Sequence, residues 1–208
     1  RLAHVPVTDI DNGRANPLKI NEAAEVFKRN AGERIYYVEG SATTSTATIR
    51  GYVAQLKRHH AASQQLITVF VDYLQKLTPQ PSPDGVLGRE DRRVTVSRVT
   101  QELRDIALQL DCAVVTISSV SRKDYKDMDV GSAKESGDIE FDADALLILE
   151  SYEKDERDRP IILENGMESM RLRIEKNRFG PKGAVPLAFV WKHARFTEID
   201  RLAQPGRR

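Results

Sequence analysis

A single carboxylate, Asp72, directly follows a run of mostly apolar and β-branched residues that begins at Leu66. Such a run is typical of a parallel strand that helices cover on both faces, because a strand buried on both sides loses its polar alternation. A carboxylate at its end lies at the rim of the sheet, where open α/β folds bind ligands, and in nucleotide-driven motors it holds Mg²⁺. Asp is also common at strand ends because it caps turns. Taken alone, Asp72 fits both interpretations equally well.

The elements that must position Asp72 can be predicted from apolar spacing and turn residues. Expected helices cover residues 20–27, 44–56 and 97–110, the second with Ser and Thr residues available as caps. Expected strands cover residues 35–38, 66–72, 112–118, 143–149, 170–176, 185–191 and 195–199. The first strands alternate with helices and the last do not. We therefore expect an α/β fold with a mostly parallel sheet, extended by antiparallel strands.

Two features of the later strands are specific. Met170, Leu172 and Ile174 alternate with charged residues, which is typical of a half-solvated strand near a sheet edge. Residues 185–191 and 195–199 are expected to form a hairpin, with Trp191 packed in a core or an interface. Residues 153–168 are rich in charge and are expected to form a solvated excursion.

The composition fits a globular protein, with 208 residues of which 40% are hydrophobic and 30% charged. A net charge of +1 provides no overall basic field, so any nucleic-acid contact must come from local patches. Cys112 is the only cysteine, which excludes an internal disulfide and a cysteine-based zinc site and suits a cytoplasmic protein. No apolar run approaches the ~18 residues of a membrane span, and no secretory signal is present. The chain opens on Arg1 rather than Met, so we expect a fragment.

Five segments, taken in order, closely resemble the C-terminal motor domain of the DnaB family of replicative helicases. They are Val71-Asp72-Tyr73-Leu74-Gln75, Ser97-Arg98, Ile117-Ser118-Ser119-Val120-Ser121-Arg122, Lys134-Glu135-Ser136-Gly137-Asp138-Ile139-Glu140-Phe141-Asp142-Ala143-Asp144 and Lys176-Asn177-Arg178-Phe179-Gly180-Pro181. Each string alone is weak, but the combination is specific. The resemblance implies a RecA-like fold, with one motor domain over residues 1–200 and a tail over 201–208.

The resemblance also implies roles in ATP hydrolysis. Asp72 matches the Walker B aspartate that orients Mg²⁺, usually through water. Lys176 and Arg178 match the finger that reaches the nucleotide of a neighbouring subunit, and the turn at Gly180-Pro181 can project them outward. A guanidinium stabilises the charge that develops on the γ-phosphate. A solvated hairpin end is the plainer interpretation of the pair, and the surrounding string favours the finger.

The resemblance further implies a contact with single-stranded DNA at the loop that contains Lys134, Glu135 and Gly137. A Lys beside a Gly lets backbone N–H groups approach phosphates, which gives affinity without sequence preference. The same residues also fit a capped helix N-terminus, which is itself an anion site. Arg89, Arg92 and Arg93 form a second candidate on a long loop, where a mobile basic segment is an equally good interpretation.

The sequence departs from the family pattern in two ways. The phosphate-binding motif G-x-x-x-x-G-K-[ST] is absent, and the family's catalytic glutamate and N-terminal collar domain would lie upstream of Arg1, which itself matches a basic residue near the γ-phosphate. Ser119 occupies the sensor position where the family has Gln, and it is too short for the same relay. We therefore expect this chain alone neither to bind nor to hydrolyse ATP.

Three functions compete. The first is part of an ATP- and Mg²⁺-dependent helicase that translocates on single-stranded DNA as a homo-oligomer, expected from the family to be a hexamer, with a primase or a loader as partner. The second is another RecA-like ATPase, such as a recombinase or a clock-type ring protein. The third is a degenerate RecA-like module that binds single strands or docks on a helicase ring. The Lys-Asn-Arg-Phe-Gly-Pro string favours the helicase.

Overall fold

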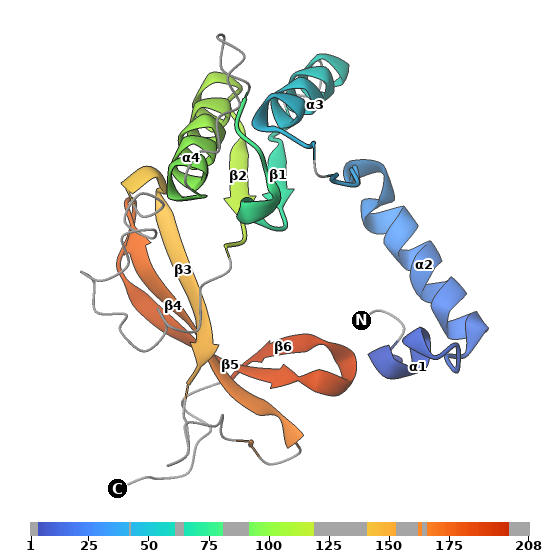
Figure 1. The fold of residues 1–208 in the computed structure, drawn as a ribbon. Helices are drawn as coiled ribbons and strands as arrows, with labels where there is room; N and C mark the ends of the chain where they lie inside the picture. Colours follow the sequence, from blue (N-terminus) through green and yellow to red (C-terminus); the bar gives the residue numbers. More distant parts are fainter. Residues whose placement is uncertain are drawn as a thin grey trace, which may run out of the picture. The chain divides into compact units, whose positions relative to one another are not determined.

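The structure is a computed structural model that describes residues 4–41, 43–60, 65–80, 92–118, 141–152, 162–163 and 166–199, with only the backbone at 92 and 93. The chain divides into two compact units. One unit is Glu39–Ala143, and the other combines Arg1–Val38 with Asp144–Arg208. Figure 1 shows the elements of both. The predicted tail over residues 201–208 and the predicted excursion over 153–168, apart from its described positions, lie outside these ranges.

The unit Glu39–Ala143 contains a parallel strand pair with helices. Its elements in chain order are α3 (Thr46–His59), β1 (Thr68–Val71), η3 (Leu74–Lys76), α4 (Arg92–Gln109) and β2 (Ala113–Thr116). In the register of the pair, Thr68 lies opposite Ala113 and Val71 opposite Thr116. α4 packs against β2, η3 and α3. The predicted helices and the parallel pairing of these two strands are thus confirmed.

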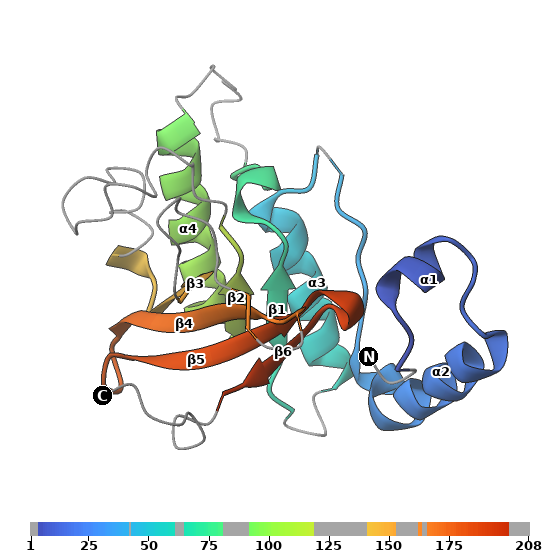
Figure 2. The ribbon, with the colours of Figure 1, turned by 90° about the horizontal axis from the view of Figure 1, so that it is seen from below.

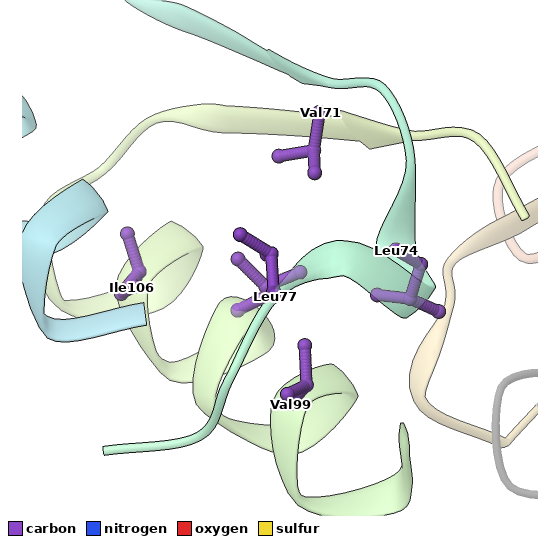
Figure 3. Packing of buried hydrophobic residues seen from close by; sticks show 6 residues of the cluster. Val71, Leu74, Leu77, Val99 and Ile106 are labelled. Carbon is purple, nitrogen blue, oxygen red and sulfur yellow. The ribbon is translucent and has the colours of Figure 1, made fainter. Parts of the chain in front are cut away.

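The core of this unit lies between the end of β1 and one face of α4. Its buried members are Val71, Leu74, Leu77, Val99, Leu103 and Ile106, most of them labelled in Figure 3. The α4 residues among them recur at helical spacing, so they share the face that α4 turns toward the strands. This packing fixes the chain on both sides of Asp72, because Val71 precedes it and Leu74 follows it closely.

The outer face of the strand pair is not buried as predicted. Phe70 is 77% exposed, and Ile117, just after β2, is 56% exposed. Residues alternate between the core and solvent along both strands. The prediction of strands buried on both faces is therefore wrong for the described part of the chain. The reason is that α4 and its neighbours cover the face that carries Val71, and an apolar run alone does not reveal which faces are covered.

Residues 35–38 do not form the predicted strand. They belong to no sheet, and Tyr37 is 89% exposed. β-propensity measures how well side chains fit a sheet that already exists. Among the described residues no strand pairs with this segment, so the propensity is not realised.

The second unit contains a four-stranded antiparallel sheet in the order β3-β4-β5-β6. Its elements are α1 (Val7–Asp11), α2 (Pro17–Ala31), η1 (Gly32–Arg34), β3 (Ala145–Ser151), β4 (Glu168–Asn177), β5 (Gly183–Val190), η5 (Trp191–His193) and β6 (Arg195–Glu198). Figure 2 shows the helices and strands among them. The predicted hairpin corresponds to β5 and β6 and is confirmed. Together with the parallel pair, this sheet confirms the α/β class with an antiparallel C-terminal extension.

The prediction for β4 is right about its faces and wrong about its place. Met170 and Leu172 share one side of the sheet, and Arg171 lies on the other. However, β4 pairs with β3 on one side and β5 on the other, so it is an inner strand. Alternating residues indicate that one face is polar, which is a property of the face and not of the strand's position in the sheet.

No helix among the residues described here is long and apolar enough to cross a membrane.

Candidate functional site

Asp72 lies immediately after β1, at the carboxyl end of the parallel pair, and its side chain is exposed. Backbone hydrogen bonds connect the two strand ends on either side of it. The Ile117 N–H donates to the Val71 carbonyl over 3.0 Å, and the Leu74 N–H donates to the Ile117 carbonyl over 2.8 Å. The peptide bond between Asp72 and Tyr73 is cis. The two hydrogen bonds hold the backbone on either side of Asp72 at the rim, and in the described part of the chain its carboxylate has no hydrogen-bond or ion-pair partner.

A side-chain hydrogen bond beside Asp72 was not predicted. The Gln75 amide nitrogen donates to the Ser118 hydroxyl over 2.8 Å, so η3 is tied to the end of β2. At Thr116, the last residue of β2, the side-chain hydroxyl is buried and has no hydrogen-bond partner among the described groups. Gln75 belongs to the string Asp72-Tyr73-Leu74-Gln75, which could have pointed to it, but the sequence does not show that its partner is Ser118.

The turn after β4 carries Arg178 and is built by its neighbours. The Asn177 side chain accepts from the Phe179 N–H over 3.3 Å and donates to the Pro181 carbonyl over 3.4 Å. A Cβ added at Gly180 would lie 2.7 Å from the Asn177 amide nitrogen, so a larger residue there would have to displace the Asn177 side chain that builds the turn. The string Lys-Asn-Arg-Phe-Gly-Pro therefore encodes a specific turn that presents Arg178 at its start.

Arg178 has a partner that the sequence did not identify. Its guanidinium contacts the Asp144 carboxylate at 2.6 Å, and its backbone N–H donates to the Asp144 carbonyl over 2.8 Å. The side chains are 43% and 57% exposed, so the pair lies at the surface. Lys176 is half-buried near the end of β4, where it lies opposite Leu146 of β3. Asp144 ends the acidic string that was noted in the sequence, which was the available signal.

Several predicted site residues lie outside the described part of the chain: Arg1, Arg89, Ser119, Lys134, Glu135 and Gly137. Arg92 and Arg93 were expected on a loop, but their backbone forms the first turn of α4. That expectation is wrong. The helix was predicted to begin at Ser97-Arg98, but it begins at Arg92.

The residues present fit part of a Mg²⁺–nucleotide site. Mg²⁺ is usually held by one or two carboxylates together with substrate phosphates, and an exposed Asp at the end of a parallel strand suits that role. In the described ranges no group of three or more His, Cys, Asp or Glu side chains could hold a metal by itself. Asp72 could therefore contribute to a metal site only together with other ligands, such as phosphate oxygens.

Residues 1–198 match the protein family described as DnaB-like helicase C terminal domain. The chain is 28% identical over 179 residues to the replicative DNA helicase DnaB of Geobacillus stearothermophilus, covering 83% of this chain and 35% of that protein. It is 30% identical over 206 residues to DnaB of Mycobacterium leprae, covering 96% of this chain and 31% of that protein. The chain spans about a third of the length of these relatives.

Solved structures share the fold. The ATPase domain of G40P gives a TM-score of 0.75 at 25% identity, over 96% of this chain and 67% of that chain. A structure of a DnaB-like replicative helicase and its interactions with primase also gives 0.75, at 24% identity, over 96% of this chain and 47% of that chain. The second likeness bears on the fold alone.

Proposed function

Because the chain belongs to the family of DnaB-like helicase C-terminal domains, we propose that it works as the motor part of a longer replicative DNA helicase. The parent protein would hydrolyse ATP with Mg²⁺ and translocate on single-stranded DNA in the cytoplasm. It would act as a homo-oligomeric ring, expected from the family to be a hexamer, with a primase or a loader as partner.

The observation that carries this proposal is the placement of Asp72. It is exposed at the carboxyl end of a parallel pair, and the hydrogen bonds from Leu74 and Gln75 to the end of β2 fix the chain that follows it. We assign Asp72 to Mg²⁺, through water, and Arg1 to the phosphates. When bound, the Mg²⁺–nucleotide supplies the phosphoryl group that is transferred, and the Asp72 carboxylate orients the metal.

Lys176 and Arg178 are proposed as the finger that acts on the nucleotide of a neighbouring subunit. Surface ion pairs stabilise a protein by about 0–1 kcal/mol at most, so the exposed pair with Asp144 is easily exchanged. The Asp144 carboxylate would hold Arg178 in an extended position until a phosphate replaces it. The rigid turn built by Asn177 and Gly180 would keep its backbone in place during this exchange.

The DNA contacts are proposed at two segments. Lys134, Glu135 and Gly137 would contact the phosphates of the strand, and Arg89, Arg92 and Arg93 would add positive charge. Ser119 would leave the coupling between nucleotide and DNA weaker than a Gln at that position, because its side chain is shorter. Binding through phosphates depends strongly on salt, since each contact releases counterions.

A mixing experiment in the full-length protein tests the finger. The variants Asp72→Ala and Arg178→Ala should each lose ATPase activity, the second by roughly 10³-fold or more, because the guanidinium stabilises the transition state. If Arg178 acts across a subunit boundary, rings assembled from both variants should regain part of the activity. Some boundaries then combine an intact Asp72 with an intact Arg178.

Lys182→Ala is the matched control, since Lys182 is a 67% exposed cation just after the same turn and should be dispensable. Mixed rings that stay as inactive as either parent would contradict the finger assignment.

The absence of the phosphate-binding motif favours a second candidate, a degenerate RecA-like module without ATPase activity. It would bind single strands or dock on a helicase ring. The gene sequence upstream of the codon for Arg1 separates the two. A phosphate-binding motif roughly 30 or more residues upstream, about one βαβ unit, restores the enzyme, whereas a start codon at that point supports the module.

A further inference from the structure

We infer that Trp191 is a platform on which a nucleobase stacks, while the cations of the same turn contact the phosphate of that nucleotide. Trp191 was expected to pack in a core or an interface, and its exposure of 64% in this chain excludes the core. It forms the start of η5, between β5 and β6. The inference rests on the proposed function in one respect, namely that the ligand is a nucleotide. It adds a contact at a residue for which no DNA or nucleotide contact was expected.

The indole is held in one orientation by a buried carboxylate. Its N–H donates to the Glu168 carboxylate over 2.9 Å, and the other carboxylate oxygen accepts from the Ser151 hydroxyl over 3.5 Å. Glu168 is only 8% exposed, and burying a carboxylate is costly unless it is hydrogen-bonded. An exposed ring that is fixed in advance loses little conformational entropy when a ligand stacks on it.

Neighbouring rings support the indole from one side. Phe189 meets it edge-on, with ring centroids 4.7 Å apart and planes at 79°. Phe196 packs against Phe189 at 4.6 Å. Phe189 and Phe196 lie opposite each other in the β5–β6 pair, so the sheet itself holds this cluster. The exposed part of the indole is left for a flat ligand.

The charge around the indole suits a phosphate. The turn continues as Lys192-His193-Ala194-Arg195, with Lys192 and Arg195 exposed. Interleaved aromatic and basic residues bind single-stranded nucleic acid through base stacking combined with backbone attraction. α1 contacts η5 and carries Asp9 and Asp11, which reduce the positive field. We therefore expect stacking to dominate over electrostatic attraction at this point.

The nucleobase could belong to a DNA strand or to a free nucleotide, and fluorescence separates these sources. Trp191 is the only tryptophan of the chain, so its emission reports on this position alone. Three ligands are titrated into the 208-residue chain: oligothymidylate, an abasic deoxyribose-phosphate strand of equal length, and ATP. We expect quenching by oligothymidylate, which carries bases, and none by the abasic strand. Quenching by the oligonucleotide alone assigns the platform to DNA, and equal quenching per base by ATP assigns it to a nucleotide.

Binding of a labelled oligothymidylate, or of labelled ATP if that is the ligand, measures the contribution of each residue. Trp191→Ala should weaken binding by roughly 5- to 100-fold, as expected for one stacked base, and Trp191→Phe should weaken it less. Glu168→Leu should weaken binding by freeing the indole. Glu168→Gln should bind as tightly as the parent chain, because the amide oxygen still accepts from the indole N–H. A merely structural Glu168 would not show this difference between Leu and Gln when circular dichroism confirms that both variants fold.

The inference is overturned if base-containing and abasic strands quench equally, if no ligand quenches, or if Trp191→Ala binds as tightly as the parent chain. If Trp191→Ala still binds single-stranded DNA in a salt-dependent way and as tightly as the parent chain, the proposed helicase function stays intact. A full-length protein without strand binding or ATP turnover would instead contradict the proposed function.

Discussion

The arginines of β4 and of the turn after it differ in whether the acidic partner of their ion pair is buried. Arg171 and Arg173 both donate to Glu150, at 2.6 and 3.0 Å, and the Glu150 side chain is only 13% exposed. Such half-buried pairs are part of the sheet, because removing one partner leaves a buried charge. Arg178 instead pairs with an exposed Asp144 and can exchange partners at little cost. Burial of the acid therefore separates the structural pairs of Arg171 and Arg173 from the exchangeable pair of Arg178.

The buried Thr116 hydroxyl leads to a stability prediction. It has no hydrogen-bond partner among the described groups, so Thr116→Val should raise the free energy of unfolding by about 1 kcal/mol. Valine has the same shape and needs no partner. Urea denaturation of both proteins measures the difference. Thr100→Val is the matched control, because the Thr100 hydroxyl donates to the Val96 carbonyl over 2.8 Å, so its loss should bring no gain. A less stable Thr116→Val variant would mean that the hydroxyl does have a partner.

Cys112 leads to a prediction about pH. Burial raises the pKa of its thiol above the ordinary 9.0, and the nearby Asp111 raises it further, while Lys57 lowers it. The folded protein therefore holds the thiol proton more tightly than the unfolded chain. The stability that this provides is complete below the unfolded pKa and is lost as pH rises through the folded value.

As pH rises past the ordinary thiol pKa of 9.0, the free energy of unfolding should fall more steeply in the parent chain than in Cys112→Ala. Other groups titrate equally in both proteins, so the difference isolates the thiol. Parallel curves would show that the thiol is not shielded from water.

At the scale of elements, short connections place the candidate residues. η3 packs its Leu74 into the core that α4 completes, so the segment after Asp72 cannot move away from β2. α3 is tied to the chain after η3, because the Thr46 N–H donates to the Thr78 carbonyl and the Thr78 N–H donates to the Thr44 carbonyl, each over 3.1 Å. The start of α3 therefore supports the same region as the core does.

The N-terminal cap of α3 can be tested directly. The Ser45 hydroxyl accepts from the Thr48 N–H, and the Thr48 hydroxyl accepts from the Ser45 N–H, which is a reciprocal capping box. Ser45→Ala should lower the free energy of unfolding by about 1 kcal/mol. Ser45→Asp keeps an acceptor at the cap and should stay close to the parent in the same denaturation experiment. Equal losses in both variants would show that Ser45 acts through some contact other than the cap.

At the scale of the whole molecule, the residues that we propose for contacts with metal, neighbour and DNA all lie in this chain, whereas the phosphate-binding motif does not occur in its sequence. One face of the β1–β2 pair is apolar and exposed. Phe70 of β1 is 77% exposed, and Leu66, just before β1, is 84% exposed. A face of this kind is usually buried in α/β proteins. The chain therefore has more sheet surface than its own described helices cover.

The isolated chain should consequently show no ATP turnover and only weak binding to single-stranded DNA. Its net charge of +1 means that local patches supply the attraction, so affinity should fall steeply with salt. Phosphate-release assays and DNA-binding titrations at several salt concentrations measure both properties. Turnover by a pure sample, or affinity that does not change with salt, would contradict this expectation.

Much of the fold was predictable from residue patterns. The helices α2, α3 and α4, the strand before Asp72 and the β5–β6 hairpin all follow from apolar spacing and turn residues, because these are local properties of the chain. The position of Asp72 at a strand end was also predictable. So was the turn that begins at Arg178, since a string such as Asn177 to Pro181 restricts the backbone wherever it occurs.

Only the tertiary structure decided which residues meet across the chain and which faces are covered. The pairs Arg178 with Asp144, Gln75 with Ser118 and Trp191 with Glu168 join positions that are 34, 43 and 23 residues apart. The exposure of Phe70 and the missing strand at residues 35–38 depend on which neighbours are present. A sequence determines its local conformational preferences by itself, but burial and pairing arise from contacts between distant segments, which no local pattern contains.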